Sequence, residues 1–240
     1  MHWRHYAITR EAHLITFDEL TITSEHGELP ALLHLPAGAH WLYVLAHGAG
    51  AGMRHGFMTQ IAEHLAAHAV ATLRYEFPYM TAGARRPDAG PRLETCVRAA
   101  VTFAQRGFAQ LRIAAGGKSM GGRITSQAQA AEPLPRLERL IFLGFPLHAA
   151  GREPNTERAA HLQSVQVPML FLQGTRDTLA DLTLMREVCT VLGERTTLHV
   201  VDGADHSFKV LRRTGRTDEQ VLDELALRIA SWLAADTAGA

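Results

Sequence analysis

The chain has 240 residues, of which 47% are hydrophobic and 20% charged, and its 24 Lys and Arg balance its 24 Asp and Glu. This length and composition suit one large α/β domain with a substantial core, and they exclude a mostly disordered chain. Because the charges cancel, no overall field favours nucleic acid or an anionic membrane, and we expect neither as a partner. A small-molecule substrate is expected by default, and the sequence leaves a protein partner open without indicating one.

The first residues, MHWRHYAITREAHL, are polar and interrupted by charges, so they lack the apolar run of a secretory signal. No stretch of the sequence is long and apolar enough to predict a membrane span. We therefore expect a cytoplasmic protein with a single domain over residues 1–240, in which 1–16 form an N-terminal extension and 235–240 are frayed. Cys96 and Cys189 fall in separate predicted helices and are expected to be free thiols.

The predicted strands come in two groups along the chain. Residues 17–35 contain two short β-rich runs around a turn at His26-Gly27, which predicts an antiparallel pair that opens the sheet. Apolar runs then alternate with segments of helical period, a rhythm typical of parallel strands with crossover helices. The sequence therefore predicts an α/β fold with a mostly parallel, doubly wound sheet and helices on both faces. The expected later strands are residues 41–46, 70–75, 111–115, 138–143, 167–172 and 197–201.

The segment Gly117-Lys118-Ser119-Met120-Gly121 matches G-x-S-x-G between a predicted strand and a predicted helix. A sharp turn at this place lifts the Ser119 hydroxyl clear of the sheet, where a base can reach it and the helix N-terminus favours developing negative charge. Glycines around the serine let neighbouring backbone approach the turn. The motif alone leaves a second interpretation open, a glycine-rich turn in which Ser119 caps the helix.

An acid and a histidine follow Ser119 in the chain order that this kind of site uses. Asp177 comes directly after a strongly apolar predicted strand, whereas the competing Asp181 is better placed to begin the next helix. His206 stands in the loop after the last predicted strand, and an imidazole titrates near neutrality, which suits it to take and return the hydroxyl proton. We therefore predict Ser119 as nucleophile, Asp177 as the orienting acid and His206 as general base.

The segment VLAHGAGAG, residues 44–52, follows the first long predicted strand. An acyl-transfer site needs two backbone amides aimed at the oxyanion, and this loop is one of the two places that supply them. The predicted oxyanion donors are the amides of Met120 and Ala49, with Gly50 as the alternative to Ala49. For His47 we predict a structural role, in which its ring holds this loop by hydrogen bonds.

Together these residues resemble the α/β-hydrolase superfamily from about Phe17 to the last helix, and in particular its small dienelactone-hydrolase-like members. The phrases LAHGAGAGM, RYEFPYM, GGKSMGGR, GFPLH, LQGTRD and GADHSF are similar to one branch, which also includes a mammalian subunit of the NSL histone-acetyltransferase complex. The resemblance implies the α/β-hydrolase fold and, since every triad position is kept, favours catalysis. Ser119 stands where dienelactone hydrolases carry a cysteine, so their substrate is not implied.

The loops around the predicted site indicate a small substrate. Residues 147–166 are all that separate two of the later predicted strands, which leaves no room for a large helical cap domain. We expect a shallow, open pocket that binds short acyl chains or small aromatic esters through apolar walls. The expected substrate-binding residues are Gly50, Phe77, Pro78, Tyr79, Phe145, Pro146 and Leu147.

Other site chemistries fit the sequence less well. The glycines of residues 48–52 lack the G-x-G-x-x-G spacing of a dinucleotide site, and Arg112 stands where a P-loop needs its first glycine. His64 and His68 are one helical turn apart, but no third metal ligand accompanies them. We therefore expect no cofactor and no metal. The alternative to a serine hydrolase that acts on esters or related acyl compounds is a noncatalytic binding or scaffold protein that retains the fold.

Overall fold

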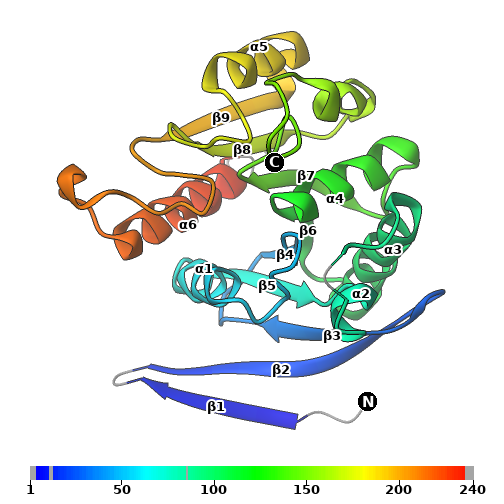
Figure 1. The fold of residues 1–240 in the computed structure, drawn as a ribbon. Helices are drawn as coiled ribbons and strands as arrows, with labels where there is room; N and C mark the ends of the chain where they lie inside the picture. The colour runs from blue at the N-terminus through cyan, green and yellow to red at the C-terminus, as the bar shows by residue number, and fades with distance from the viewer. Residues whose placement is uncertain (1–3, 11–12, 85, 236–240) are drawn as a thin grey trace.

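The structure is a computed structural model that describes residues 4–10, 13–84 and 86–235, with side chains from residue 17 onward. Its strands are β1 (Arg4–Arg10), β2 (His13–Ser24), β3 (Gly27–His34), β4 (Trp41–Ala46), β5 (Val70–Tyr75), β6 (Arg112–Lys118), β7 (Leu137–Leu143), β8 (Met169–Gly174) and β9 (Thr196–Val201). Within the described residues these nine strands form one sheet in the order β1-β2-β3-β5-β4-β6-β7-β8-β9 (Figure 1). Neighbours from β1 to β5 pair antiparallel, and neighbours from β5 to β9 pair parallel.

Helices and 3₁₀ turns connect the parallel strands, and the last helix follows the last of them. The helices are α1 (Gly56–Ala67), α2 (Pro78–Thr81), α3 (Gly90–Gly107), α4 (Met120–Ala131), α5 (Leu182–Leu192) and α6 (Asp218–Ala234), with 3₁₀ turns η1 (Glu157–Ser164), η2 (Gly193–Arg195) and η3 (Arg212–Thr214). In the part of the chain that the structure describes, no helix is both long and apolar enough to cross a bilayer.

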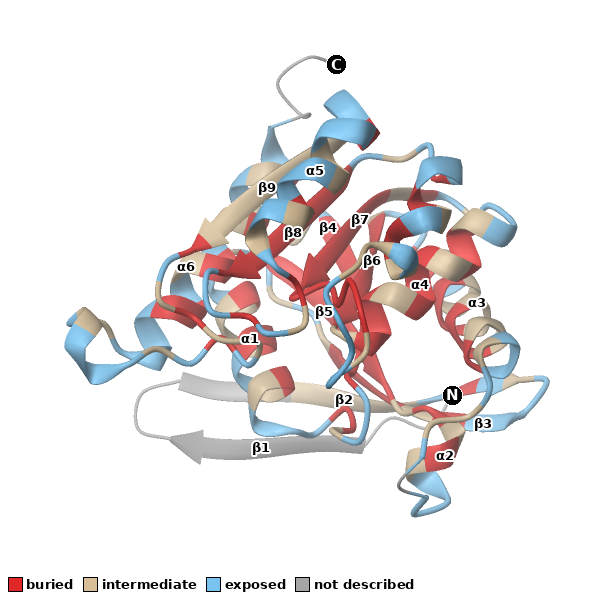
Figure 2. Cartoon of the chain, turned by 45° about the horizontal axis from the view of Figure 1, so that its top comes forward, coloured by how far each residue is buried: buried red, intermediate tan, exposed pale blue. Residues whose placement is uncertain are grey.

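The core lies on both faces of the sheet because helices cover both. Along β4, Leu42 and Val44 pack in the apolar cluster beneath α3 and α4, while Tyr43 and Leu45 pack in the cluster beneath α1 and α6. Successive side chains of a strand point to opposite faces, so a strand covered on both sides is apolar throughout. Figure 2 shows the result, with β4 to β8 buried and the helices buried on their inner sides. The predicted α/β fold with a mostly parallel, doubly wound sheet and helices on both faces is confirmed, and the described residues contain no large cap domain.

The start of the chain differs from the prediction. Residues 1–16 were expected as an extension, yet β1 pairs with β2 from Arg4↔Glu19 to Arg10↔His13, and β2 begins at His13. The two strands form a hairpin at the edge of the sheet. A strand at an edge need not be covered on both faces, so it tolerates polar residues that hide its period in the sequence.

The order of the strands places a ligand site. The chain goes from β4 to β5 on one side of β4 and then returns to β6 on its other side. At such a switch point the loops that follow the two strands diverge and leave a crevice at their carboxyl ends. The loop that begins at His47 follows β4, and Ser119 follows β6. Both predicted elements of the acyl-transfer site therefore lie beside this crevice.

Candidate active site

Ser119 lies on the turn between β6 and α4 with φ 51° and ψ −115°. A positive φ is uncommon for a residue other than glycine and marks local strain. The backbone is packed closely around this turn, since a Cβ at Gly117 would lie 2.1 Å from the oxygen of Ala46 and one at Gly121 would lie 2.4 Å from it. The Ser119 side chain makes no capping hydrogen bond to α4. Ser119 is thus the N-cap residue by position, but its side chain does not cap the helix, and its hydroxyl is left for another partner.

That partner is His206. Ser119 Oγ lies 2.9 Å from Nε2 of His206, and Nδ1 of His206 lies 2.7 Å from Oδ2 of Asp177. The side chain of Asp177 is fully buried, and its carboxylate also accepts from the side-chain amide of Gln173 and, at 2.8 Å, from the backbone N–H of Leu179. Because the carboxylate accepts a hydrogen bond from Nδ1–H, it holds the His206 proton on Nδ1, and Nε2 is left to accept the proton of the hydroxyl. The three predicted residues thus form one hydrogen-bonded chain across the ends of β6, β8 and β9.

The competing acid has a different partner. Asp181 is the N-cap of α5, and its carboxylate accepts from the backbone N–H groups of Thr183 at 2.8 Å and Leu184 at 3.2 Å. These bonds satisfy two of the amides that a helix start leaves unpaired. The prediction that Asp181 begins the helix is confirmed.

Lys118 holds the loop that carries His206, a role that the sequence analysis missed. Its Nζ donates to the backbone oxygen of His206 at 2.6 Å and lies 5.6 Å from the centre of the Phe208 ring. Burial lowers the pKa of Lys118 to about 8, and the charges of Asp177 and Asp205 offset part of this effect. Lys118 occupies the variable position before the motif serine, so no spacing rule marks it.

The two predicted oxyanion amides are unengaged. Among the described residues, neither the N–H of Ala49 nor that of Met120 has a hydrogen-bond acceptor. Met120 is the first residue of α4, where the helix supplies no acceptor. The N–H of Gly50, the alternative donor, is occupied because it donates to the hydroxyl of Tyr79 at 3.1 Å.

The buried side chain of His47 holds the loop after β4 by hydrogen bonds. Its Nδ1 donates to the backbone oxygen of Gly48 at 2.8 Å, and its Nε2 accepts from the N–H of Phe77 at 3.2 Å. The His47 ring also packs edge-on against the Phe77 ring, with centroids 4.9 Å apart. The predicted structural role of His47 is confirmed.

Comparison with known proteins shows the family and the fold of the chain. Residues 39–234 match the family model described as an alpha/beta hydrolase domain. The chain belongs to the α/β-hydrolase family. The hydrolase is similar in structure to an α/β serine hydrolase homologue from Coxiella burnetii, with a TM-score of 0.70 and 21% identity over 93% of this chain and 98% of that one.

Two further solved structures share the fold of this hydrolase. A serine hydrolase without a lid from Xanthomonas campestris has a TM-score of 0.69 and 21% identity, over 90% of this chain and 94% of that one. A dienelactone hydrolase from Anabaena variabilis has a TM-score of 0.70 and 18% identity, over 96% of each chain. The expected structural likeness to dienelactone hydrolases is therefore confirmed at the level of the fold.

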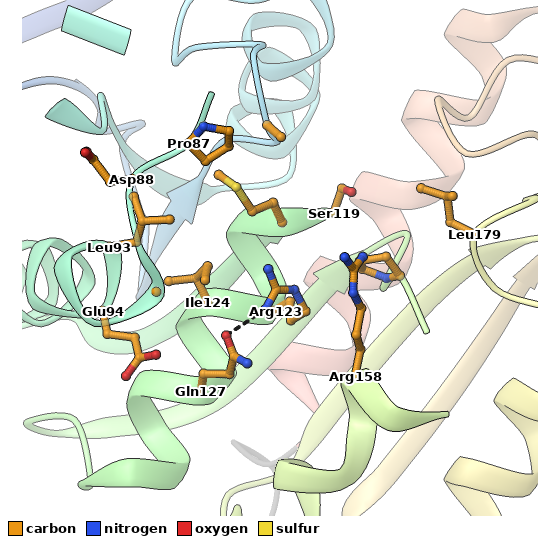
Figure 3. Close-up of a pocket in the computed structure, with 14 residues that line it drawn as sticks. Pro87, Asp88, Leu93, Glu94, Ser119, Arg123, Ile124, Gln127, Arg158 and Leu179 are labelled. Atoms are coloured by element: carbon orange, nitrogen blue, oxygen red, sulfur yellow. Dashed lines mark hydrogen bonds between the residues drawn. The ribbon is translucent and has the colours of Figure 1, made fainter. Parts of the chain in front are cut away.

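A cavity of about 440 Å³ opens beside Ser119 in this hydrolase (Figure 3). Ala49, Met120 and Pro146 line it, as expected. The rest of the wall comes from residues 87–94, from the side of α4 that follows Ser119, and from Arg158 and Leu179. The cavity therefore reaches from the predicted oxyanion donors toward charged side chains on α3, α4 and η1.

Most of the predicted apolar wall lies elsewhere. Four of the expected wall residues are core residues with at most 3% of their surface exposed: Phe77, Tyr79, Phe145 and Leu147. Pro78 and Gly50 also lie outside the lining of the cavity. The large apolar side chains of both loops turn inward because burying them removes more apolar area from water than a pocket wall would. The wall is consequently more charged than the sequence analysis predicted.

Proposed function

We propose that this α/β hydrolase is a serine hydrolase that cleaves esters or related acyl compounds through an acyl-enzyme at Ser119. The observation that carries the proposal is the chain of hydrogen bonds from Ser119 Oγ through His206 to Asp177, at 2.9 and 2.7 Å. His206 takes the hydroxyl proton as Oγ attacks the acyl carbon, and it returns that proton to the leaving group. A water molecule then repeats the sequence and releases the acid.

The amides of Ala49 and Met120 are the proposed oxyanion donors. Both residues line the same cavity as Ser119, and neither amide has an acceptor within the described part of the chain. Donors of this kind stabilise the charge that develops on the acyl oxygen, and losing one costs about 10²- to 10³-fold in rate. Because Tyr79 engages Gly50, we propose Ala49 as the donor from this loop.

The proposed substrates are small. A cavity of 440 Å³ lies near the lower end of the sizes that hold small ligands, about 300–1,000 Å³. We propose a carboxylesterase or thioesterase type of activity on short acyl groups. The relation to the NSL complex subunit and the cytoplasmic location stay predictions from the sequence.

The experiment is the hydrolysis of p-nitrophenyl esters by the wild type and by Ser119→Ala. We expect release of p-nitrophenol from acetyl and butyryl esters by the wild type only, with both proteins folded by circular dichroism. The rate is expected to fall for chains beyond about ten carbons, because each CH₂ contributes about 0.8 kcal/mol only when it is buried, and the 440 Å³ cavity beside Ser119 is too small to bury so long a chain. Release of p-nitrophenol by neither protein would support the scaffold alternative, and equal hydrolysis by both would contradict Ser119 as the nucleophile.

A further inference from the structure

Two arginine side chains face the cavity beside Ser119, and neither is paired with a carboxylate in the part of the chain that the structure describes. Arg123 comes from α4 and Arg158 from η1, and both are half-buried. Nη1 of Arg123 donates to Oε1 of Gln127 at 2.9 Å, and Nη1 of Arg158 donates to the backbone oxygen of His148 at 2.9 Å. Among the described residues neither guanidinium forms an ion pair. Since a guanidinium carries five N–H donors, most of the donors of these two groups have no acceptor within the described residues.

The surroundings of Arg123 favour an additional anion. Its Nε is buried and has no hydrogen-bond partner within the described residues. Burial and the like charge of Arg158 lower the pKa of Arg123, and Glu94 offsets only part of this effect. A buried donor without a partner and two neighbouring like charges are both unfavourable. An anion bound between the two guanidinium groups would relieve both.

The acids of the cavity lie on its other side. Oδ1 of Asp88 pairs with Arg92 at 3.4 Å. Figure 3 shows Asp88 and Glu94 beyond Arg123, whereas Arg123 and Arg158 lie next to each other below Ser119. The end of the cavity nearest the serine is therefore its positive end.

The helix sets the distance between the serine and this positive end. The backbone N–H of Arg123 donates to the oxygen of Ser119 at 3.1 Å, so Arg123 lies one helical turn beyond the serine. One turn rises about 5.4 Å, and helical side chains lean back toward the N-terminus. A short acyl chain held on Ser119 spans this distance.

We propose that the substrates are half-esters or half-thioesters of short dicarboxylic acids, whose free carboxylate binds Arg123 and Arg158. This inference rests on the proposed hydrolysis at Ser119. Guanidinium groups bind carboxylates in a planar, bidentate manner that other cations lack. The bond from Ser119 Oγ to the acyl carbon forms as the bond to the alcohol or thiol breaks, and water then releases the dicarboxylic acid.

The test compares two esters that differ only at the far end of the acyl chain, p-nitrophenyl hemiglutarate and p-nitrophenyl valerate. The wild type is expected to have the higher kcat/KM for the hemiglutarate. Arg123→Gln and Arg158→Gln are each expected to lower that kcat/KM about 10- to 100-fold, mainly through KM, because each removes a hydrogen bond between charged groups. The kcat/KM for the valerate ester should be nearly the same in the wild type and in both variants.

The matched control is Arg186→Gln, which removes the same charge from an exposed position on α5 outside the cavity and should leave both esters unaffected. A wild type that prefers valerate, or arginine variants that slow both esters equally, would overturn the inference while the proposed function stands.

If neither ester is hydrolysed, the proposed function fails and the arginine site is tested by itself. Glutarate binding to Ser119→Ala is then measured by calorimetry, in the presence and absence of the Arg123→Gln change. Saturable binding that weakens with Arg123→Gln supports the site, and absence of binding overturns it.

Discussion

The carboxyl-terminal edge of the sheet, where the parallel strands end and Ser119 lies, and the wall of the adjoining cavity are built in different ways. The first of these regions is called the sheet edge below. At the sheet edge, the polar groups of Ser119, His206 and Asp177 are paired with one another and with buried neighbours. In the wall, Arg123 and Arg158 come from a helix and a 3₁₀ turn and are half-buried, and Nε of Arg123 has no hydrogen-bond partner within the described residues. Backbone geometry fixes the first region, while side chains from distant segments make up the second.

We infer from this difference that the sheet edge carries out the reaction and that the cavity wall selects the substrate. The paired groups at the sheet edge are held before any substrate arrives, which is what proton transfer and nucleophilic attack require. Unpaired charges in the wall gain most when a complementary ligand binds, so they discriminate between ligands. Changes at the sheet edge should therefore lower the rate for every substrate, and changes in the wall should alter which substrate is preferred.

The largest expected effect is that of Asp177→Asn. An amide at this position favours the wrong tautomer of His206, and the corresponding change in serine proteases lowers kcat about 10⁴-fold. We expect a loss of that order for every ester tested, with the fold retained, measured as kcat on acetyl and hemiglutarate esters. A loss of kcat for only one of the esters would contradict the assignment of catalysis to the sheet edge and of substrate selection to the cavity wall.

Lys118→Met is expected to have the next largest effect. It removes the ammonium that bonds the backbone of His206 and keeps the apolar stem among its neighbours. Small displacements of a reacting group can cost about 10²-fold, so we expect kcat to fall about 10- to 100-fold with KM nearly constant. Lys209→Met, an exposed change in the same loop, is the control. A change in KM alone would mean that Lys118 contacts substrate rather than positioning His206.

Gly121→Ala tests the close packing under the serine turn. The added Cβ would lie 2.4 Å from the oxygen of Ala46, and the backbone must shift to accept it. Overpacking of this kind costs about 1–3 kcal/mol in the free energy of unfolding, measured by urea denaturation. Gly107→Ala at the end of α3 is the control, since its Cβ would meet no atom within 4 Å. Equal effects of the two changes would contradict the account of the turn.

The smallest expected effect is on the pH dependence of stability, and it involves His161, which lies on η1 with Arg158. Burial, assisted by the charge of Arg123, lowers the pKa of His161 from 6.5 to about 4. Between these values the unfolded chain binds a proton that the folded chain does not, so stability falls as the pH falls. His161→Gln should lose less stability than the wild type between pH 7 and pH 5, by urea denaturation. His26→Gln, in the exposed turn between β2 and β3, should behave like the wild type, and identical losses in all three would refute the prediction.

The sheet edge was largely predictable from the sequence. Strand ends bring residues to one edge, so the order of Ser119, Asp177 and His206 after successive apolar runs was enough to predict that they meet. Asp181 was assigned to the helix start for the same kind of local reason. The β1 strand was missed because its edge position removes the apolar alternation that marks a strand.

The cavity wall was not predictable in the same way. Phe77 and Phe145 were assigned to the wall because they lie in loops beside the site, but packing buries both rings. Arg123 and Arg158 are 35 residues apart and follow no spacing rule, so only the folded chain shows that they share a cavity. Local patterns predict elements, whereas the direction of a loop side chain depends on contacts that are distant in sequence.

Covalent labelling shows directly whether Ser119 is an activated nucleophile. The wild-type protein is treated with a fluorophosphonate probe, digested, and analysed by mass spectrometry to locate the modified residue. Only an activated serine reacts with such a probe, since an ordinary hydroxyl is a weak nucleophile. We expect one adduct, on Ser119, that is absent in His206→Ala. An unmodified Ser119 in the folded wild type, or an adduct on a different serine, would contradict the proposed role of Ser119.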